Sequence, residues 1–359
     1  MADNKSQVNK NKQDAATPNR ASSFVAVVFL IVGLLPIFAA GIKLVQNFIS
    51  HIHKQTINRL EPILPPPTTV RIAFATAISI AISIRGLRKK SLDLSGSITA
   101  VVVGFCMTLS NTGFFIVLIT FFFTSSSLTK FKSEIKRRIE DDFKEGGQRN
   151  WVQVLCNGGI PCVAAIIYVM TIGSGILPIN FMRFKYYNPS LLAVSVVTSL
   201  ACCAGDTWAS EIGSAIGSRT PRLITTLQPV PVGTNGGISI IGTISSIAGG
   251  LVIGLSYYLS IYWCCDRTDN AWDKQPPQWP IIVCGALAGF LGSMIDSYLG
   301  ASVQYSGYCK ESKKVLHYRT ENSLHISGYA ILNNHAVNFV SSLITTIIMS
   351  YGAVTYWPA

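Results

Sequence analysis

The sequence predicts an all-α, polytopic membrane protein, a bundle of about nine transmembrane helices with a range of about seven to nine. Of the 359 residues, 49% are hydrophobic and 13% are charged, whereas a soluble domain carries about 25% charged residues. The apolar residues form long blocks, and the short polar stretches between them hold nearly all the charges. The lipid bilayer is therefore the expected environment.

Nine blocks are candidate spans. They cover residues 24–46, 69–84, 97–109, 112–128, 151–172, 190–212, 238–262, 280–300 and 324–351. The third and fourth are short and meet at the turn signal Asn111-Thr112-Gly113, which indicates either a tight hairpin or a re-entrant pair. We expect three regions: a disordered cytosolic tail over 1–22, an anchor helix with a non-cytosolic loop over 23–68, and a multi-pass membrane domain over 69–359.

Lysine and arginine are unevenly shared between alternate loops. With a cytosolic N-terminus, the tail and the cytosolic loops hold 21 of these residues and the opposite loops hold 6. This bias predicts that orientation. It also explains the net charge of +12, and without a basic-aromatic module nucleic acid is not an expected partner. No transit peptide is visible, so we expect the endoplasmic reticulum or another endomembrane.

Three carboxylates, Asp206, Glu211 and Asp296, fall inside predicted spans. A charge at the bilayer centre costs about 2.5–3.5 kcal/mol on insertion scales, so such residues usually face a bundle interior or a wet cavity. Amide side chains are predicted at the same cytosolic depth: Asn157, Asn333, Asn334 and Asn338. Because three carboxylates repel one another without a cation, and Mg²⁺ prefers oxygen ligands, the pattern predicts a Mg²⁺ site. The alternative is an interhelical hydrogen-bond network that only holds the bundle together.

A glycine-rich segment precedes the seventh predicted span. It contains Gly233, Thr234, Asn235, Gly236 and Gly237. A glycine turn that leads into a helix N-terminus can present backbone N–H groups to an anion, which predicts a phosphate site. The alternative is an ordinary turn in which Thr234 or Asn235 caps the helix.

Lys130 is the basic residue of the loop 129–150 that lies closest to the membrane. It directly follows a hydroxyl-rich run, Thr124–Thr129. At this boundary its ammonium group is a candidate partner for a lipid or nucleotide phosphate. The alternative is that the loop is only a solvated amphipathic connector.

Several long motifs occur in one order along the chain. They are 125–130 (SSSLTK), 149–154 (RNWVQV), 205–213 (GDTWASEIG), 233–239 (GTNGGIS) and 292–300 (GSMIDSYLG). With these motifs the chain resembles the transmembrane protein 19 family, which includes the plant chloroplast phytyl-phosphate kinase. The likeness runs from about residue 70 to the C-terminus.

More remotely, the arrangement is similar to that of dolichol kinases and related lipid kinases that use CTP. Their Gly-Asp helix would fall on Gly205-Asp206, and their phosphate loop on Gly233-Thr234. Those enzymes carry a Lys-Ser and a Glu just before the loop, where this chain has Val230-Pro231-Val232. The resemblance implies a nucleoside triphosphate co-substrate, with CTP favoured, although this departure bears directly on the choice of nucleotide.

The leading hypothesis is a membrane-embedded phosphotransferase, a kinase that acts on an isoprenoid alcohol or isoprenoid monophosphate. In it Asp206, Glu211 and Asp296 position Mg²⁺, the 233–237 loop holds the donor phosphates, and Asn334 or Asn338 (or Asn333) orients the lipid acceptor. The alternatives are an ion- or proton-coupled transporter and a non-catalytic membrane scaffold. The oligomeric state is not indicated.

Overall fold

The computed structural model describes residues 63–130, 147–216, 220–265, 275–312, 314–320 and 323–359. The chain divides into two compact units, Met1–Phe48 and Ile49–Ala359, and every described residue belongs to the second. The predicted tail over 1–22, the predicted first span, and all but the end of the region 23–68 lie outside the described residues.

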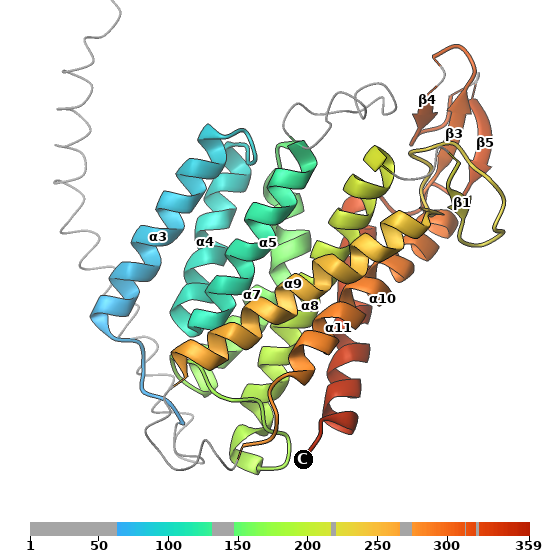
Figure 1. The fold of residues 1–359 in the computed structure, drawn as a ribbon. Coiled ribbons are helices and arrows are strands. Elements are labelled where there is room, and N and C mark those ends of the chain that lie inside the picture. Colours follow the sequence, from blue (N-terminus) through green and yellow to red (C-terminus); the bar gives the residue numbers. More distant parts are fainter. Residues whose placement is uncertain (1–62, 131–146, 217–219, 266–274, 313, 321–322) are drawn as a thin grey trace, which may run out of the picture. The chain divides into compact units, whose positions relative to one another are not determined.

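The described residues fold mainly into long helices (Figure 1). The helices are α3 (Thr69–Arg88), α4 (Leu94–Ser110), α5 (Thr112–Lys130), α7 (Trp151–Thr171), α8 (Phe184–Ile216), α9 (Ile240–Cys264), α10 (Pro280–Val303) and α11 (Asn334–Tyr356). Seven of them are long and apolar enough to cross a membrane, and α4 is apolar but shorter, at 17 residues. The predicted class, a polytopic helical bundle, is confirmed for this part of the chain.

The helices alternate in direction along the chain (Figure 1). Side-chain caps fix several of their starts: Asp93 accepts a hydrogen bond from the N–H of Gly96 at 2.7 Å, and Asn150 forms a capping box with Gln153. Between α4 and α5 only Asn111 intervenes, and its Oδ1 accepts from the N–H of Gly113 at 2.7 Å. At 1.5 Å per residue α4 is roughly 25 Å long, so this pair is the tight hairpin of the two predicted alternatives.

Helices α8, α9 and α10 touch through their backbones. A Cβ atom added at Gly205 would lie 2.5 Å from the Cα of Gly289, and one at Gly250 would lie 2.1 Å from the carbonyl oxygen of Gly285. Small residues allow such close approach of membrane helices. We call these contacts of Gly205, Gly250, Gly285 and Gly289 the glycine seam. It places α8, the most buried of the candidate spans, against both neighbours.

Two small sheets lie beyond the helix ends. Strands β1 (Arg222–Leu223) and β2 (Gly237–Ile238) form one antiparallel pair. Strands β3 (Ser306–Cys309), β4 (Lys314–Leu316) and β5 (Ser323–Ser327) form an antiparallel sheet in the order β4-β3-β5. The sequence did not predict these strands, because each is short, β1 to β4 lie in polar connections, and β5 falls in the predicted last span.

The predicted start of the last span is wrong. Residues 324–327 belong to β5, and α11 begins at Asn334. Gly328 has a φ of 70°, a left-handed conformation that ends the strand. Asn333 then caps α11 by accepting a hydrogen bond from the N–H of Ala336 at 2.9 Å. Hydropathy alone did not separate the apolar strand from the helix.

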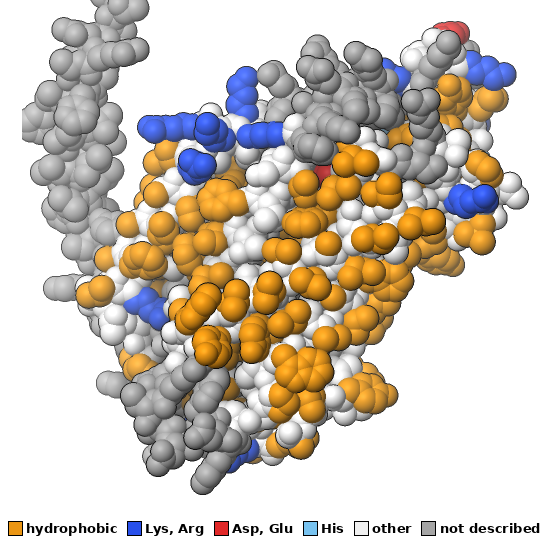
Figure 2. Space-filling model, viewed as in Figure 1, with side chains coloured by type: hydrophobic (Ala, Val, Ile, Leu, Met, Phe, Trp, Pro, Cys, Tyr) orange, Lys and Arg blue, Asp and Glu red, His pale blue; other side chains and the backbone are white. Residues whose placement is uncertain are grey.

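We call the end of the bundle where α3, α5, α8 and α10 end the basic end. The described residues of the connections there are 89–93, 147–150, 220–239, 304–312, 314–320 and 323–333. On the face shown in Figure 2, hydrophobic side chains cover the middle of the bundle, and Lys and Arg side chains gather over the ends of α3 and α5. Among the described residues, the Lys and Arg side chains outside the helices thus lie mainly at the basic end. The cytosolic orientation of this end stays a prediction.

Candidate functional site

Two carboxylates from different helices meet inside the bundle. Asp206 of α8 and Asp296 of α10 are both half-buried and interact electrostatically. They lie roughly 10–15 Å from the ends of their helices at the basic end. The Oγ of Ser341, on α11, donates a hydrogen bond to Oδ2 of Asp296 at 3.1 Å. We call Asp206 and Asp296 the acidic pair.

Hydroxyl groups continue from the acidic pair along the contact between α8 and α11. The Oγ atoms of Ser199 and Ser342 are 2.9 Å apart, and those of Ser195 and Ser350 are 3.1 Å apart. We call these four serines the hydroxyl seam. Ser341 and Ser342 were missed by sequence reasoning; they follow Asn338 by three and four residues, a spacing that places all three side chains on one face of α11.

The predicted asparagines have different roles. Oδ1 of Asn338 is buried and has no hydrogen-bond partner among the described residues, and the carbonyl oxygen of Asn338 accepts from Ser341 at 3.1 Å. Asn334 is exposed, and its Oδ1 lies at 3.5 Å from Nε2 of Gln304. Asn333 is the cap of α11. Of the three, Asn338 is therefore the one whose side chain is buried and still able to accept a hydrogen bond.

The predicted trio of carboxylates does not assemble. Nowhere in the described ranges do three or more His, Cys, Asp or Glu side chains form a group that could hold a metal ion. Glu211 follows Asp206 by five residues, which turns its side chain about 140° around the helix axis. The described residues thus do not group Glu211 with Asp206 and Asp296, and its role as a metal ligand stays a prediction.

The remaining oxygen atoms still fit Mg²⁺. Proteins often bind this ion through one or two carboxylates, with water and substrate phosphates completing the shell. The acidic pair supplies two carboxylates, and the buried, unpartnered Oδ1 of Asn338 lies one helical turn from Ser341, which contacts Asp296. Mg²⁺ itself stays a prediction.

The glycine-rich loop 233–237 packs on the end of α10. Gly233 and Gly236 have φ values of 92° and 77°, which favour glycine. A Cβ atom at Gly236 would lie 2.5 Å from the carbonyl oxygen of Ser297, the residue that follows Asp296. The loop and the acidic pair thus share the last turns of α10.

Several N–H groups of this loop already donate within the protein. Asn235 N–H donates to Oγ of Ser306 at 3.1 Å, and Gly237 N–H donates to the carbonyl of Thr234 at 3.0 Å. Thr234 itself is buried, and its N–H donates to the carbonyl of Pro231 at 3.2 Å. The cap of α9 is Ser239, neither Thr234 nor Asn235 as the alternative reading had predicted.

Lys130 belongs to another part of the bundle. Its Nζ donates to the carbonyl oxygen of Lys89 at 2.5 Å, and it interacts electrostatically with Arg149. Both partners lie at the ends of helices α3 and α7. No contact within the described residues joins Lys130 to the glycine-rich loop, so the two predicted phosphate contacts do not form one site.

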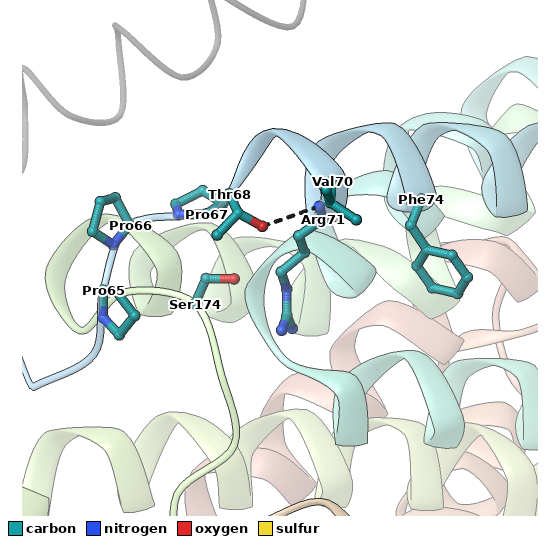
Figure 3. A pocket seen from close by; sticks show the side chains of 8 residues that line it. All are labelled: Pro65, Pro66, Pro67, Thr68, Val70, Arg71, Phe74 and Ser174. Atoms are coloured by element: carbon teal, nitrogen blue, oxygen red, sulfur yellow. Dashed lines mark hydrogen bonds between the residues drawn. The ribbon is translucent and has the colours of Figure 1, made fainter.

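A hollow of about 380 Å³ lies at the opposite end of the bundle (Figure 3). Its lining includes Pro65, Arg71, Phe74 and Ser174. Nε of Arg71 donates to the carbonyl oxygen of Leu109 at 3.0 Å, so its guanidinium satisfies the end of α4. The hollow is far from the acidic pair along the helices and contains no carboxylate.

Comparison with known proteins gives a family match over most of the chain. The model of a family described as "Integral membrane protein DUF92" matches residues 77–346. Protein PGR of Arabidopsis thaliana is 41% identical over 287 residues, which are 79% of this chain and 96% of that protein. No solved structure matches the chain.

More distant relatives come from an archaeon and a plant. The uncharacterized membrane protein MJ0933 of Methanocaldococcus jannaschii is 27% identical over 78% of this chain and 94% of its own length. Protein VTE6, chloroplastic, of Arabidopsis thaliana is 26% identical over 65% of this chain and 56% of its own length. The organelle in that name does not support the predicted endoplasmic reticulum.

Proposed function

The chain belongs to the DUF92 family of integral membrane proteins, and from this premise we propose that it is a membrane-embedded phosphotransferase acting on an isoprenoid alcohol or isoprenoid monophosphate. The family resemblance read from the motifs is confirmed, and the chain is an integral, multi-pass protein of the lipid bilayer. The proposal is supported by the resemblance to a family that includes phytyl-phosphate kinase.

The acidic pair is the observation that carries the proposal. Three helices, α8, α10 and α11, bring Asp206, Asp296 and Ser341 together within the bilayer part of the bundle. Burying two interacting carboxylates is costly unless something offsets their charge. Phosphoryl transfer needs mainly positioning and charge neutralisation, and the pair is suited to both.

Each residue has a defined role in the proposal. Asp206 and Asp296 hold Mg²⁺, which when bound offsets the charge of the transferred phosphoryl group. Ser341 fixes the orientation of Asp296 by its hydrogen bond. Asn338 orients the acceptor head, because its buried Oδ1 is available to accept a hydrogen bond.

The donor is proposed to be a nucleoside triphosphate, with CTP favoured by the resemblance. Its phosphates would contact the loop 233–237 beside the end of α10. Because N–H groups of this loop donate internally, donor binding must exchange those hydrogen bonds. Hydrogen exchange of residues 233–237 measured with and without CTP tests this step, and unchanged exchange contradicts it.

The activity test uses the full chain purified in detergent with Mg²⁺, radiolabelled CTP or ATP, and a panel of prenyl alcohols and prenyl monophosphates. We expect a labelled lipid product that is lost in Asp206→Asn. The matched control is Glu311→Gln, which removes one exposed carboxylate at the turn between β3 and β4. Absence of product from every acceptor, or full activity in Asp206→Asn, rejects the proposal.

The hydroxyl seam favours one alternative, an ion- or proton-coupled transporter. Ser195 with Ser350 and Ser199 with Ser342 form two hydroxyl pairs between α8 and α11, and both pairs lie from the acidic pair toward the other end of the bundle. Intramembrane acids beside such polar groups are typical of transport pathways. Cation-dependent flux in proteoliposomes without any phosphorylated product would favour the transporter. If neither flux nor product is detected, the non-catalytic scaffold remains as the interpretation.

A further inference from the structure

A narrow crevice runs between α3, α4, α5 and α7, on a different side of α8 from the glycine seam. It has a volume of about 80 Å³ and an apolar lining. The lining residues are Ser79, Ile82, Ser83, Leu92, Ala100, Val103, Gly104, Phe115, Leu118, Ile119, Phe121, Phe122, Arg149, Gln153, Val154, Asn157 and Gly158. Along α5 the lining extends from Phe115 to Phe122, which is roughly 10 Å of helix. A crevice of this size admits about the first one or two isoprene units of one slender chain and excludes a pair of acyl chains.

One cation lies in this apolar lining. The backbone of Arg149 is held on both sides: its N–H donates to the carbonyl of Ser91 and its carbonyl accepts from the N–H of Asp93, each at 3.1 Å. Its carbonyl oxygen also lies 2.1 Å from where a Cβ atom would stand on Gly96, so a glycine is needed there. Arg149 is therefore fixed in place before any ligand arrives.

The guanidinium of Arg149 is desolvated but stays charged. Burial lowers the pKa of Arg149 to about 10, which is still well above neutral pH. Among the described residues its side chain donates to the hydroxyl of Ser126, at 2.8 Å. A hydroxyl accepts a hydrogen bond from one of the five N–H donors of an arginine, but it does not neutralise the positive charge. The remaining donors suit an anion that arrives with the ligand.

The surroundings of Arg149 are basic. Lys130 is close enough to interact electrostatically with both Arg149 and Lys89. Among the described residues, the carboxylate near Arg149 is that of Asp93. Its Oδ1 caps α4, because it accepts hydrogen bonds from Ser95 Oγ and from the N–H of Gly96, both at 2.7 Å. Within the described residues, the charges around the crevice mouth are thus complementary to an anionic head group.

Polar side chains lead from Arg149 toward the acidic pair. Gln153 and Asn157 lie four residues apart on α7, so both face the crevice on the same side of the helix. The Sγ of Cys203, on α8, lies 3.7 Å from the carbonyl oxygen of Asn157. Asp206 follows Cys203 by three residues, less than one turn of α8. One wall of the crevice, α7, is thus in contact with α8 about one helical turn from Asp206.

We propose that this crevice binds the phosphate-proximal part of the hydrocarbon chain of a single-chain isoprenoid phosphate and that Arg149 binds its phosphate. The proposal rests on the proposed function in one respect, the choice of an isoprenoid as the chain. It narrows that function to the phosphorylated acceptor, because an alcohol has no charge for Arg149 to neutralise. Arg149 is a binding residue for the acceptor that the sequence motif around it does not reveal.

The test measures binding without a nucleotide, so that it does not depend on catalysis. The full chain in lipid nanodiscs is incubated with a radiolabelled C20 isoprenyl monophosphate that carries a diazirine on its first isoprene unit. After photolysis, mass spectrometry locates the labelled peptides. We expect label on α4, α5 and α7 at residues that line the crevice, and competition by unlabelled C20 monophosphate but not by dioleoyl phosphatidic acid.

Charge and space are then tested separately. Arg149→Gln is expected to weaken C20 monophosphate binding about tenfold or more and to leave C20 alcohol binding nearly unchanged. The control Arg88→Gln removes an exposed arginine at the end of α3 and is expected to bind like wild type. If Arg149→Gln does not fold, Ala100→Phe fills the crevice without touching Arg149, and we expect it to abolish crevice labelling.

The outcomes separate this site from the kinase. Label outside the crevice, equal competition by phosphatidic acid (an ordinary bilayer lipid), or equal affinities of Arg149→Gln and Arg88→Gln would each overturn the binding site. Arg149-dependent binding with no product in the radiolabelled nucleotide assay would reject the kinase and leave the site intact. Product formation without crevice labelling would reject the binding site and leave the kinase proposal intact.

Discussion

The two sides of the bundle differ in how their helices meet. In the glycine seam α8, α9 and α10 touch backbone to backbone, because Gly250 faces Gly285 and Gly205 faces Gly289. Around the crevice, α3, α4, α5 and α7 leave space between them, and large side chains such as Phe115 and Phe122 line this space. One side has no freedom to move without breaking contacts, and the other can repack side chains around a guest.

This difference matches what the two sides are proposed to do. Carboxylates that bind a metal must be held within a fraction of an ångström, which rigid helix contacts provide. A hydrocarbon chain needs an apolar space that adapts to its bends, which phenylalanine side chains provide. The side of the glycine seam (the tight side) would then position the catalytic groups, and the side of the crevice (the loose side) would select the substrate.

The largest effect is expected from the glycine seam. In Gly250→Leu the new side chain must occupy space taken by the carbonyl of Gly285, where even a Cβ atom would be 2.1 Å away. Because helices α9 and α10 must separate, we expect the protein to lose its monodisperse peak in size-exclusion chromatography after detergent extraction. The cost exceeds the roughly 1–3 kcal/mol of ordinary overpacking.

The matched control is Gly352→Leu on α11, where a Cβ atom meets nothing within 4 Å. We expect this variant to extract and elute like wild type. If Gly250→Leu also elutes like wild type, the seam is not rigid, and the contrast between the two sides is lost.

A second effect concerns the support of the acidic pair. Ser341→Ala removes the hydrogen bond of 3.1 Å to Oδ2 of Asp296. Loss of a residue that orients a metal ligand typically costs about 10- to 100-fold in metal affinity or activity. We expect the Mg²⁺ concentration for half-maximal product formation to rise by a factor in that range.

The control for that variant is Ser302→Ala, which removes a hydroxyl near the end of α10 that donates only to the carbonyl of Tyr298 in the same helix. An unchanged Mg²⁺ requirement is expected there. A lower maximal rate in Ser341→Ala at an unchanged Mg²⁺ requirement would contradict the orienting role, since it would point to general loss of folded protein.

A third effect tests the loose side. Phe115 lies at the crevice end farthest from Arg149 along α5, so Phe115→Ala should deepen the crevice. We expect selectivity between acceptors to shift toward the longer prenyl chain, by a factor on the order of 10 in the ratio of kcat/KM values, as changes of hydrophobic pockets usually do. Phe123→Ala, on the exposed side of the same helix, should leave the ratio unchanged.

The sequence predicted the helices well because their signal is local. A long apolar block needs a helix in lipid, where every backbone group must be satisfied within the element. The boundary at Asn334 was missed because β5 is also apolar, and the small sheet pairs residues far apart in sequence, such as Gly307 with Leu316 and Tyr308 with Leu324. No local pattern carries that information.

The site was predictable only in part, for a related reason. The presence of carboxylates inside predicted spans identified Asp206 and Asp296 as site candidates, and the structure brings these two residues together. The same criterion also identified Glu211, whose direction around α8 depends on helix geometry that a charge count ignores. Arg149 belongs to one of the family motifs, but no site role was predicted for it, because its burial against Ser91 and Ser126 arises from tertiary contacts.

The smallest expected effect is the coupling energy between serines of the hydroxyl seam. This measurement tests whether the seam only packs the helices that hold the acidic pair. The Oγ atoms of Ser199 and Ser342 are 2.9 Å apart in the core. We expect the double-mutant cycle of Ser199→Ala and Ser342→Ala to give a coupling energy of about 0.6 kcal/mol, the average for such bonds in membrane proteins. Reversible unfolding in mixed micelles measures it.

The same variants separate packing from transport. If the seam only packs helices, both single variants keep product formation near the wild-type level, because neither serine touches Asp206 or Asp296. If the seam conducts protons or cations, proteoliposome flux falls in each single variant, since one missing hydroxyl interrupts a chain of hydrogen bonds. A fall in flux with unchanged stability would therefore reassign the tight side from catalysis to transport.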